Sequence, residues 1–222
     1  MQIHADLSER AVVDTAALNW VASPAAGVER KMLDRDGGEV ARATSLVRFA
    51  PGSDFETHTH GAGEEFFVLD GVFSDESGDY GPGVYVRNPT GSSHAPSSAA
   101  GCTIFVKLRQ FAPDDDRQFA IDTRAAEWQP HGVAGVSMLP LHAHGSERVM
   151  LLRFEPGTRF PEHGHRRGEE IFVLEGALAD EFGHYPKGTW VRSPPGSAHT
   201  PVSGGGCLTY LKTGHLPVPA QR

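Results

Sequence analysis

Apolar positions along the chain fall in short runs that turn-forming residues interrupt. Examples are "TSLVRFA" from Thr44, "EFFVLDGVF" from Glu65 and "CTIFVKL" from Cys102, all rich in β-branched and aromatic residues. Gly, Pro, Asp and Ser separate such runs at short intervals, and neither half of the chain has a helical pattern. This pattern is typical of β-strands joined by tight turns, so we predict an all-β sandwich or closed barrel.

The pattern occurs twice. The stretch "HTHGAGEEFFVLDGVFSDESGDY" begins at His58, and "HGHRRGEEIFVLEGALADEFGHY" begins at His163. The offset of 105 residues (163 − 58) holds without a gap through the core of both copies. A further match, "VDTAALNW" from Val13 with "IDTRAAEW" from Ile121, lies at an offset of 108 (121 − 13) and extends the repeat toward its start.

This duplication predicts two domains, one over residues 1–112 and one over residues 113–222. A polar segment with an acidic run, "RQFAPDDDRQFA", separates the two copies and is typical of a solvated linker. Each copy repeats the same turn, "PGS" from Pro51 and "PGT" from Pro156. The matching "DESGDY" and "DEFGHY" are typical of hairpin connections.

Charge and composition exclude several classes of partner. The net charge of −8 argues against nucleic acid or an anionic membrane as the main partner. No apolar run approaches the length of a membrane span, and the opening "MQIHADLSER" lacks the pattern of a signal peptide. We therefore expect a cytoplasmic protein with two free thiols, Cys102 and Cys207, acting as small core residues.

The candidate chemistry lies in the repeated histidines. His58 and His60 are two residues apart, so on a strand both imidazoles project from one face. Glu64 follows, and His94 comes later in the same copy. The second copy repeats the set at the same spacing, as His163, His165, Glu169 and His199. Three imidazoles and one carboxylate suit a divalent transition metal, which predicts one metal per copy. Zinc or iron is the first expectation, with manganese or nickel as alternatives.

These residues resemble the two motifs of the cupin superfamily. The first, G-x5-H-x-H-x3,4-E-x6-G, matches Gly52, His58, His60, Glu64 and Gly71, and again Gly157, His163, His165, Glu169 and Gly176. The second, G-x5-P-x-G-x2-H-x3-N, matches Gly83, Pro89, Gly91 and His94, and again Gly188, Pro194, Gly196 and His199. Ser98 and Ser203 stand where the family often has asparagine, which is not a ligand. The motif also selects Glu64 rather than Glu65 as the ligand, which leaves Glu65 and Glu170 facing away and in need of a basic partner if buried.

The finer resemblance is to the ChrR-like cupins. The shared features are "GEEFFVLDG" and "GEEIFVLEG", followed by "GVYVRNPTGSSH" and "GTWVRSPPGSAH", and then by "GCTIFVK" and "GCLTYLK". The resemblance implies two tandem RmlC-like jelly-roll barrels in one chain, that is, a bicupin. It also suggests that the flanking "VDT…W" and "IDT…W" strands are exchanged between the barrels.

Two functions follow from this resemblance and stay open. The named member of the group is an anti-ECF sigma factor whose cupin part binds zinc, which implies a sensor, a regulatory module or a small-ligand-binding protein. The sigma-binding motif H-x3-C-x2-C is absent here, so any signal would pass through a separate regulatory partner. The alternative is an Fe(II) dioxygenase acting on a diketone or hydroxyketone. Both functions need a small-molecule ligand or substrate, and a homodimer is compatible with either.

Some residues near the predicted ligands differ between the copies or have two interpretations. Gly61 and Ala62 in the first copy become Arg166 and Arg167 in the second, either on a solvent-facing loop or attracting a carboxylate ligand. The repeated cations Arg87, Arg192, Lys107 and Lys212 either form structural ion pairs or face the pocket. A further pair, His142 and His144, has no glutamate at the matching distance and is expected at the surface.

Overall fold

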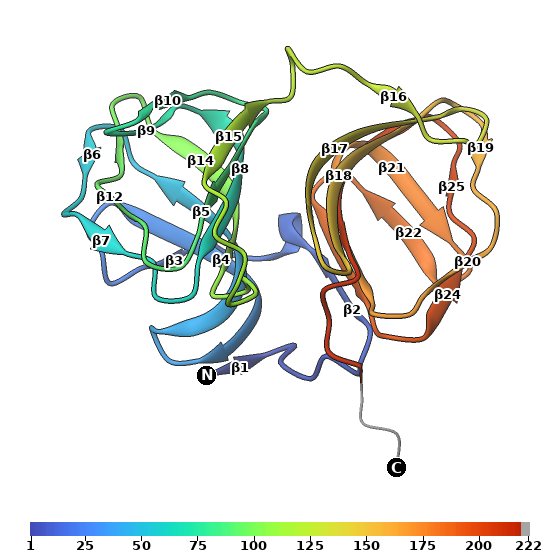
Figure 1. Ribbon diagram of the computed structural model, residues 1–222, viewed down its shortest axis with the longest axis horizontal. Coiled ribbons are helices and arrows are strands. Elements are labelled where there is room, and N and C mark those ends of the chain that lie inside the picture. The colour runs from blue at the N-terminus through green and yellow to red at the C-terminus, as the bar shows by residue number, and fades with distance from the viewer. Residues whose placement is uncertain (219–222) are drawn as a thin grey trace. The chain divides into compact units, whose positions relative to one another are not determined.

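The computed structural model describes residues 1–218 and consists almost entirely of β-strands (Figure 1). It divides into two compact units. The N-terminal barrel comprises Met1–Ala5 and Leu18–Ala126, and the C-terminal barrel comprises Asp6–Ala17 together with the chain from Glu127 onward. Each unit is a jelly roll of antiparallel sheets, which confirms the prediction of two tandem all-β barrels.

The N-terminal barrel is built on one large sheet of order β1-β4-β5-β14-β8-β11-β15, with β3 paired to β4, and on smaller sheets of order β10-β9-β13-β6 and β12-β7. Its strands are β1 (Gln2–Ile3), β3 (Val21–Ala22), β4 (Val28–Gly37), β5 (Ala41–Phe49), β6 (Ser53–Asp54), β7 (His58–Thr59), β8 (Glu64–Gly71), β9 (Phe73–Asp75), β10 (Gly78–Tyr80), β11 (Val84–Asn88), β12 (Ser93–His94), β13 (Ser97–Ser98), β14 (Cys102–Leu108) and β15 (Phe119–Asp122).

The C-terminal barrel repeats this arrangement with a large sheet of order β16-β17-β18-β26-β21-β23-β2 and a small sheet of order β20-β24. Its elements are β2 (Ala11–Asp14), the 3₁₀ turn η1 (Thr15–Ala17), β16 (Gln129–Pro130), β17 (Val136–His144), β18 (Glu147–Phe154), β19 (Thr158–Arg159), β20 (His163–His165), β21 (Glu169–Asp180), β22 (Gly183–Pro186), β23 (Thr189–Ser193), β24 (Ser197–His199), β25 (Val202–Ser203) and β26 (Cys207–Thr213). Within residues 1–218, no helix has the length and apolar character needed to cross a membrane.

Each barrel is completed by a strand from the other half of the sequence. Strand β2 opens the first repeat but pairs with β23, and its buried residues Ala11 and Val13 alternate with exposed ones. Strand β15 opens the second repeat but pairs with β11. The two strands of the "VDT" and "IDT" matches are therefore exchanged, as the family resemblance suggested.

Both barrel interiors are lined by apolar residues that alternate along the strands. The N-terminal core includes Phe49, Phe66, Val68 and Phe73, and the C-terminal core includes Phe154, Ile171, Val173, Leu178 and Leu211. The two cysteines are buried free thiols within these cores, as expected. Burial of these faces removes apolar surface from water, which is the main force that closes each barrel.

The second glutamate of each "GEE" sequence points away from the barrel interior. Glu65 Oε2 accepts hydrogen bonds from Arg87 Nη1 at 2.8 Å and from the Tyr85 hydroxyl at 2.6 Å. Arg87 Nη2 also donates to Asp115 Oδ2 at 2.6 Å. Successive residues of a strand face opposite sides, so Glu65 finds its basic partner behind the sheet while Glu64 faces inward. Arg87 therefore forms a structural ion pair.

In the C-terminal barrel, Trp190 stands at the position that matches Tyr85 in the first copy. Glu170 accepts a hydrogen bond from Trp190 Nε1 at 3.0 Å and forms a 2.9 Å contact with His215 Nε2.

The expectation that His142 lies at the surface is wrong, because its exposed fraction is only 5%. This residue follows an irregularity in the pairing of β17 with β18, which changes the direction of the side chains beyond Pro140.

Gly71 ends the first motif, and the backbone there leaves no room for a side chain. Its φ is +71°, and an added Cβ would collide with the Gly101 carbonyl oxygen and lie 2.7 Å from Cys102 Cα. We predict that Gly71→Ala lowers the free energy of unfolding by more than about 3 kcal/mol, because the β8–β14 ladder must move. Gly52→Ala is the matched control, since its φ is +76° but nothing lies within 4 Å of the added Cβ. It should cost only about 1 kcal/mol in urea unfolding, and equal losses would contradict the steric explanation.

Candidate metal centres

Two short strands and a turn assemble the N-terminal centre. His58 on β7 lies opposite His94 on β12. His60 is held by its own backbone, since its N–H donates to Ser92 O at 2.9 Å and its carbonyl accepts from Gly91 N at 2.8 Å. Glu64 is the first residue of β8. One ligand atom from each of His58, His60, Glu64 and His94 lies within 4.8 Å of the others.

The C-terminal centre is assembled in the same way. His163 and His199 are opposite one another in the pairing of β20 with β24, and His165 is opposite Ser197. Glu169 begins β21. One ligand atom from each of His163, His165, Glu169 and His199 again lies within 4.8 Å of the others. The structure thus brings together all eight residues that the sequence selects, four in each barrel.

Hydrogen bonds orient the N-terminal imidazoles toward the centre. His60 Nδ1 lies 2.9 Å from Ser92 Oγ, which itself donates to a backbone carbonyl, so Nδ1 carries the proton. His94 Nδ1 donates to Asp75 Oδ2 at 3.1 Å. Both rings therefore present an unprotonated Nε2 to Glu64, whose Oε1 lies 3.5 and 3.6 Å from them. Such outer partners are typical of metal-binding histidines, because they set the tautomer.

Hydrogen bonds also orient two of the C-terminal imidazoles, one of them through the equivalent of the His94–Asp75 contact. His163 Nδ1 donates to Pro161 O at 2.9 Å, and His199 Nδ1 donates to Asp180 Oδ2 at 3.0 Å. His199 Nε2 then lies 3.4 Å from Glu169 Oε1. The sequence analysis assigns Asp75 and Asp180 only to hairpin connections. Their matching places in "DESGDY" and "DEFGHY" are the sequence feature that could have indicated a role beside the histidines.

The donor sets fit a metal cation. Among the described residues, buried Nε2 atoms of His60, His94, His165 and His199 have no hydrogen-bond partner, and neither has Glu169 Oε1. A buried polar atom without a partner costs free energy, and the Nε2 atoms of His60, His94 and His199 face the glutamate of their own centre. A divalent cation would satisfy them together. Both clusters could therefore hold a metal ion, and the chemistry of three nitrogens and one oxygen suits a first-row transition metal.

Burial keeps the ligands in different protonation states. It lowers the pKa of His60 and His199, and it lowers the pKa of His165 to about 3, so these imidazoles are neutral near pH 7. Burial raises the pKa of Glu169 to about 8, although the nearby Arg10 guanidinium opposes this shift. Neutral imidazoles are ready to bind a cation, whereas the Glu169 carboxyl must first lose a proton.

The space beside the two centres differs greatly. A cavity of about 410 Å³ lies in the N-terminal barrel, bordered by His58, Glu64 and His94 and otherwise mostly by apolar side chains. The corresponding space in the C-terminal barrel is only about 20 Å³ and is bordered by His163 and Glu169. His58 is exposed, whereas His163 is only partly so. The first centre is therefore open to a molecule of some size, and the second is closed.

Larger side chains at the edge and in the interior of the C-terminal barrel accompany this difference. Ser23 and Ala25 line the N-terminal cavity. The positions that match them in the strand register carry His131 and Val133. The His131 ring packs at 5.1 Å, between centroids, on Phe160. Phe160 in turn lies 4.7 Å from the His163 ring. Larger side chains thus press an aromatic ring over the second centre and fill the space that small residues leave open in the first.

Basic side chains near the two centres do not border these cavities. This holds for Arg87, Lys107, Arg166, Arg167, Arg192 and Lys212. Arg166 and Arg167 are both exposed, and within the described chain neither borders the space beside His163. This supports the solvent-facing interpretation of that loop. Lys212 is fully buried and lies 3.0 Å from Glu147 Oε1, as an ion pair.

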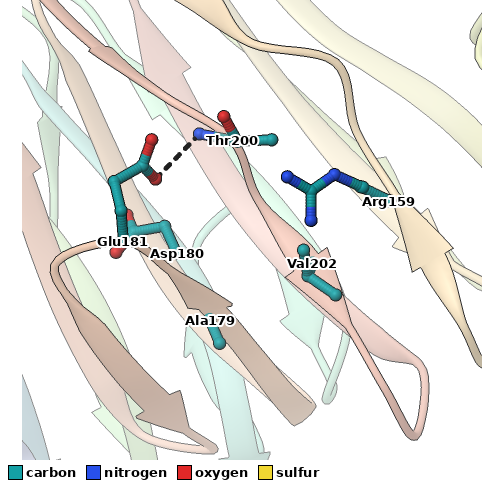
Figure 2. A pocket seen from close by; sticks show the side chains of 6 residues that line it. All are labelled: Arg159, Ala179, Asp180, Glu181, Thr200 and Val202. Atoms are coloured by element: carbon teal, nitrogen blue, oxygen red, sulfur yellow. Dashed lines mark hydrogen bonds between the residues drawn. The ribbon is translucent and has the colours of Figure 1, made fainter.

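A separate surface cavity lies outside the second centre (Figure 2). It has a volume of about 320 Å³ and is lined by Arg159, Ala179, Asp180, Glu181, Thr200 and Val202. The hydrogen bond from the Thr200 amide to Glu181 Oε2, at 3.0 Å, crosses one end of it. Asp180 therefore separates this surface cavity from His199.

The raised pKa of Glu169 predicts the pH dependence of the metal-free protein. In the unfolded chain a glutamate loses its proton near pH 4.5, whereas in the fold Glu169 keeps it until about pH 8. Between these values the folded state binds more protons, so the free energy of unfolding falls as pH rises. Urea unfolding of metal-free protein should show a loss of about 1 kcal/mol between pH 7 and 8 that Glu169→Gln lacks. An equal loss in both proteins would contradict the assignment.

Comparisons with known proteins agree with this description. The ChrR cupin-like domain family matches the chain twice, over residues 8–112 and 116–217. A comparison with curated proteins gives no match.

Solved structures share the fold at low sequence identity. A candidate dioxygenase from Nostoc punctiforme is 17% identical, with a TM-score of 0.78 over 96% of this chain and 85% of its own. A cupin 2 conserved barrel domain protein from Leptotrichia buccalis is 12% identical, with a TM-score of 0.62 over 96% and 99%. A variant of the oxalate decarboxylase from Bacillus subtilis is 13% identical, with a TM-score of 0.65 over 96% and 78%. Two family matches, two barrels and two histidine–glutamate clusters lead to one conclusion: the chain is a bicupin that belongs to the ChrR cupin-like family.

Proposed function

We propose that this protein is a metal-dependent small-molecule-binding bicupin whose working site is the N-terminal centre. The observation that carries the proposal is the cavity of about 410 Å³ bordered by His58, Glu64 and His94. This volume lies within the range of small-molecule sites. Three histidines and Glu64 would hold the metal at the border of this cavity, where it could bind an oxygen atom of a small molecule.

The lining of the cavity indicates the kind of ligand. Apart from the three proposed metal ligands, it consists mainly of side chains such as Val47, Phe55 and Ile104, and Glu56 is its other charged residue. Among the described residues, no lysine or arginine borders it. A dicarboxylate such as oxalate would find no cationic side chain here to pair with the oxygens that do not reach the metal. We therefore infer a neutral, largely apolar ligand with at least one oxygen atom that can reach the metal.

The residues of the chain hold this ligand and its metal in a defined geometry. Ser92 and Asp75 keep the His60 and His94 rings in the tautomer that offers Nε2 to the metal. Phe49, Phe55 and Phe73 pack edge to face and limit the water beside the ligand. The bound metal would supply Lewis-acid polarisation of the ligand oxygen.

A second candidate is an Fe(II) dioxygenase acting on a diketone or hydroxyketone. The observation that favours it is the same apolar chamber beside the first centre, because such a chamber would limit the water beside a bound Fe(II) and its substrate. A sensor or regulatory module uses the same chamber differently, with ligand binding as its signal. Binding of a regulatory protein partner and formation of a homodimer remain predictions.

Metal analysis tests the two centres separately. Protein purified without chelators or a metal-affinity tag should contain close to two equivalents of divalent transition metal, measured by plasma mass spectrometry. His94→Ala and His199→Ala should each lower this to about one, because each removes one ligand of one centre. The double variant should contain none. Two equivalents in the double variant would show that the metal binds elsewhere.

Exchange of the residues that open and close the barrels tests the working site. In a His199→Ala background loaded with Co(II), 2,4-pentanedione should change the visible absorption of the remaining centre. Ser23→His with Ala25→Val should abolish that change while the Co(II) spectrum remains, because the cavity is filled. His131→Ser with Val133→Ala, in the other barrel, is the matched control and should leave it intact.

Oxalate should produce a much smaller change in the same experiment. Perturbation by oxalate but not by the diketone would overturn the inferred ligand class. Retained diketone binding in the filled variant would overturn the cavity as the ligand site. Oxygen consumption by the Fe(II) protein with a diketone, followed with an oxygen electrode, separates the dioxygenase from a protein that only binds.

A further inference from the structure

Arg10 lies in the segment Asp6–Ala17, which belongs to the C-terminal barrel although it lies at the start of the first repeat in the sequence. This segment adds β2 to the edge of the large sheet, where Ala11 pairs with Arg192 and Asp14 with Thr189. Residue Arg10 stands immediately before that strand, and its side chain is 22% exposed. A charged side chain that is mostly buried at a sheet edge requires specific partners.

The Arg10 guanidinium contacts groups on three strands. Nη2 donates to Asp180 Oδ2 on β21 at 3.1 Å and to the Tyr185 hydroxyl on β22 at 2.7 Å. Nη1 donates to Ser193 Oγ on β23 at 3.0 Å. The guanidinium also lies 4.7 Å from the centre of the Phe182 ring. The planar fork of arginine suits such simultaneous contacts, and a lysine could not make them all.

Two of these contacts lie directly behind proposed metal ligands. Asp180 Oδ2, which accepts from Arg10, is the same atom that accepts from His199 Nδ1 at 3.0 Å. Ser193 is the strand partner of Glu169. Asp180 is also held by the Tyr185 hydroxyl, which donates to Oδ1 at 2.6 Å. Arg10 therefore fixes the carboxylate that fixes the His199 ring.

The N-terminal barrel lacks this arrangement. Gln118 precedes β15 as Arg10 precedes β2, and its amide donates to Asn88 Oδ1 at 3.3 Å. Asp75, the equivalent of Asp180, is held by the Tyr80 hydroxyl at 3.1 Å. The arginine contact to the outer carboxylate is thus a feature of the closed centre. The open centre has a neutral amide at the matching position.

We propose that the C-terminal centre is a structural metal site that fastens the exchanged segment Asp6–Ala17 to its barrel, with Arg10 as the positioning residue. Metal bound by His199 needs that ring to be held by Asp180, and Arg10 holds Asp180 only while the segment is docked. Coupling of this kind is reciprocal, so bound metal must also strengthen docking of the segment. The closed space of about 20 Å³ beside this centre suits a structural role.

The charge of Arg10 acts in the opposite direction but is the smaller effect. A cation near a metal site repels the metal, yet Arg10 is paired with the buried Asp180, and the pair carries no net charge. Arg10 also orders the His199 ring through Asp180, and among the described residues no opposing contact cancels this favourable effect on metal binding. Loss of an outer partner typically costs 10- to 100-fold in metal affinity, and a residue one step further out is expected near the lower limit.

The first test measures zinc affinity at the C-terminal centre alone. In a His94→Ala background, which removes the N-terminal centre and its ligand binding, zinc is titrated against a chromophoric chelator. Arg10→Gln, which reproduces the residue of the other barrel, should weaken binding by about tenfold. Val12→Thr is the matched control, because Val12 lies on the same segment but is 47% exposed, and it should bind like the parent. Unchanged affinity in Arg10→Gln, or no zinc bound by the parent, would overturn the proposal.

The second test measures docking of the segment. Zinc should slow hydrogen exchange of the β2 amides by several-fold in the His94→Ala parent and have little effect in its Arg10→Gln variant. The amides of β18 and β26 serve as an internal reference. Arg10→Lys covers the case in which the glutamine variant folds poorly, since it keeps the charge but not the fork. A lysine variant that matches the parent, or β2 amides indifferent to zinc in the parent, would overturn the positioning role.

Discussion

The organisation of both barrels depends on a cluster of unprotonated nitrogens and carboxylate oxygens that face one another in a buried space. Where the glutamate is ionised, lone pairs directed at one another have no donor to satisfy them, and a cation would satisfy them together. Ser92 and Asp75 in one barrel, and Asp180 in the other, hold the proton on the far side of the imidazoles. The short pairs β7–β12 and β20–β24 bring together histidines that are far apart in the sequence.

Although the two clusters have nearly the same ligand geometry, their surroundings suit different tasks. Small residues at the edge of the N-terminal barrel leave an apolar chamber beside an exposed histidine. In the C-terminal barrel, His131 and Phe160 fill that chamber, and Arg10 supports the carboxylate behind His199. Duplication supplies two copies of one donor set, and substitutions outside it leave a large space beside one centre and almost none beside the other. Comparison of the ligands alone would not distinguish them.

Strands β2 and β15 are exchanged between the two repeats. Each barrel contains a strand from the other half of the sequence, so neither large sheet is complete within one repeat. The second glutamate of each "GEE" is buried on the other side of the strand, where Tyr85 donates to Glu65 and Trp190, at the matching position, donates to Glu170. Both repeats therefore keep a glutamate facing inward and a hydrogen-bonded glutamate behind it.

The sequence by itself determined the all-β class, the duplication and the eight residues that cluster. These depend on local rules: strand periodicity places His58 and His60 on one face, and a constant offset repeats the set. The roles of Asp75 and Asp180, the contact of Arg10 and the burial of His142 were decided only by the tertiary structure. The tertiary structure also decided the volumes of the two cavities. Whether Ser23 or His131 leaves space in its barrel depends on the aromatic ring packed nearby, Phe55 or Phe160. Such features depend on distances between residues remote in sequence and on how completely side chains fill a barrel, and neither follows from spacing along the chain.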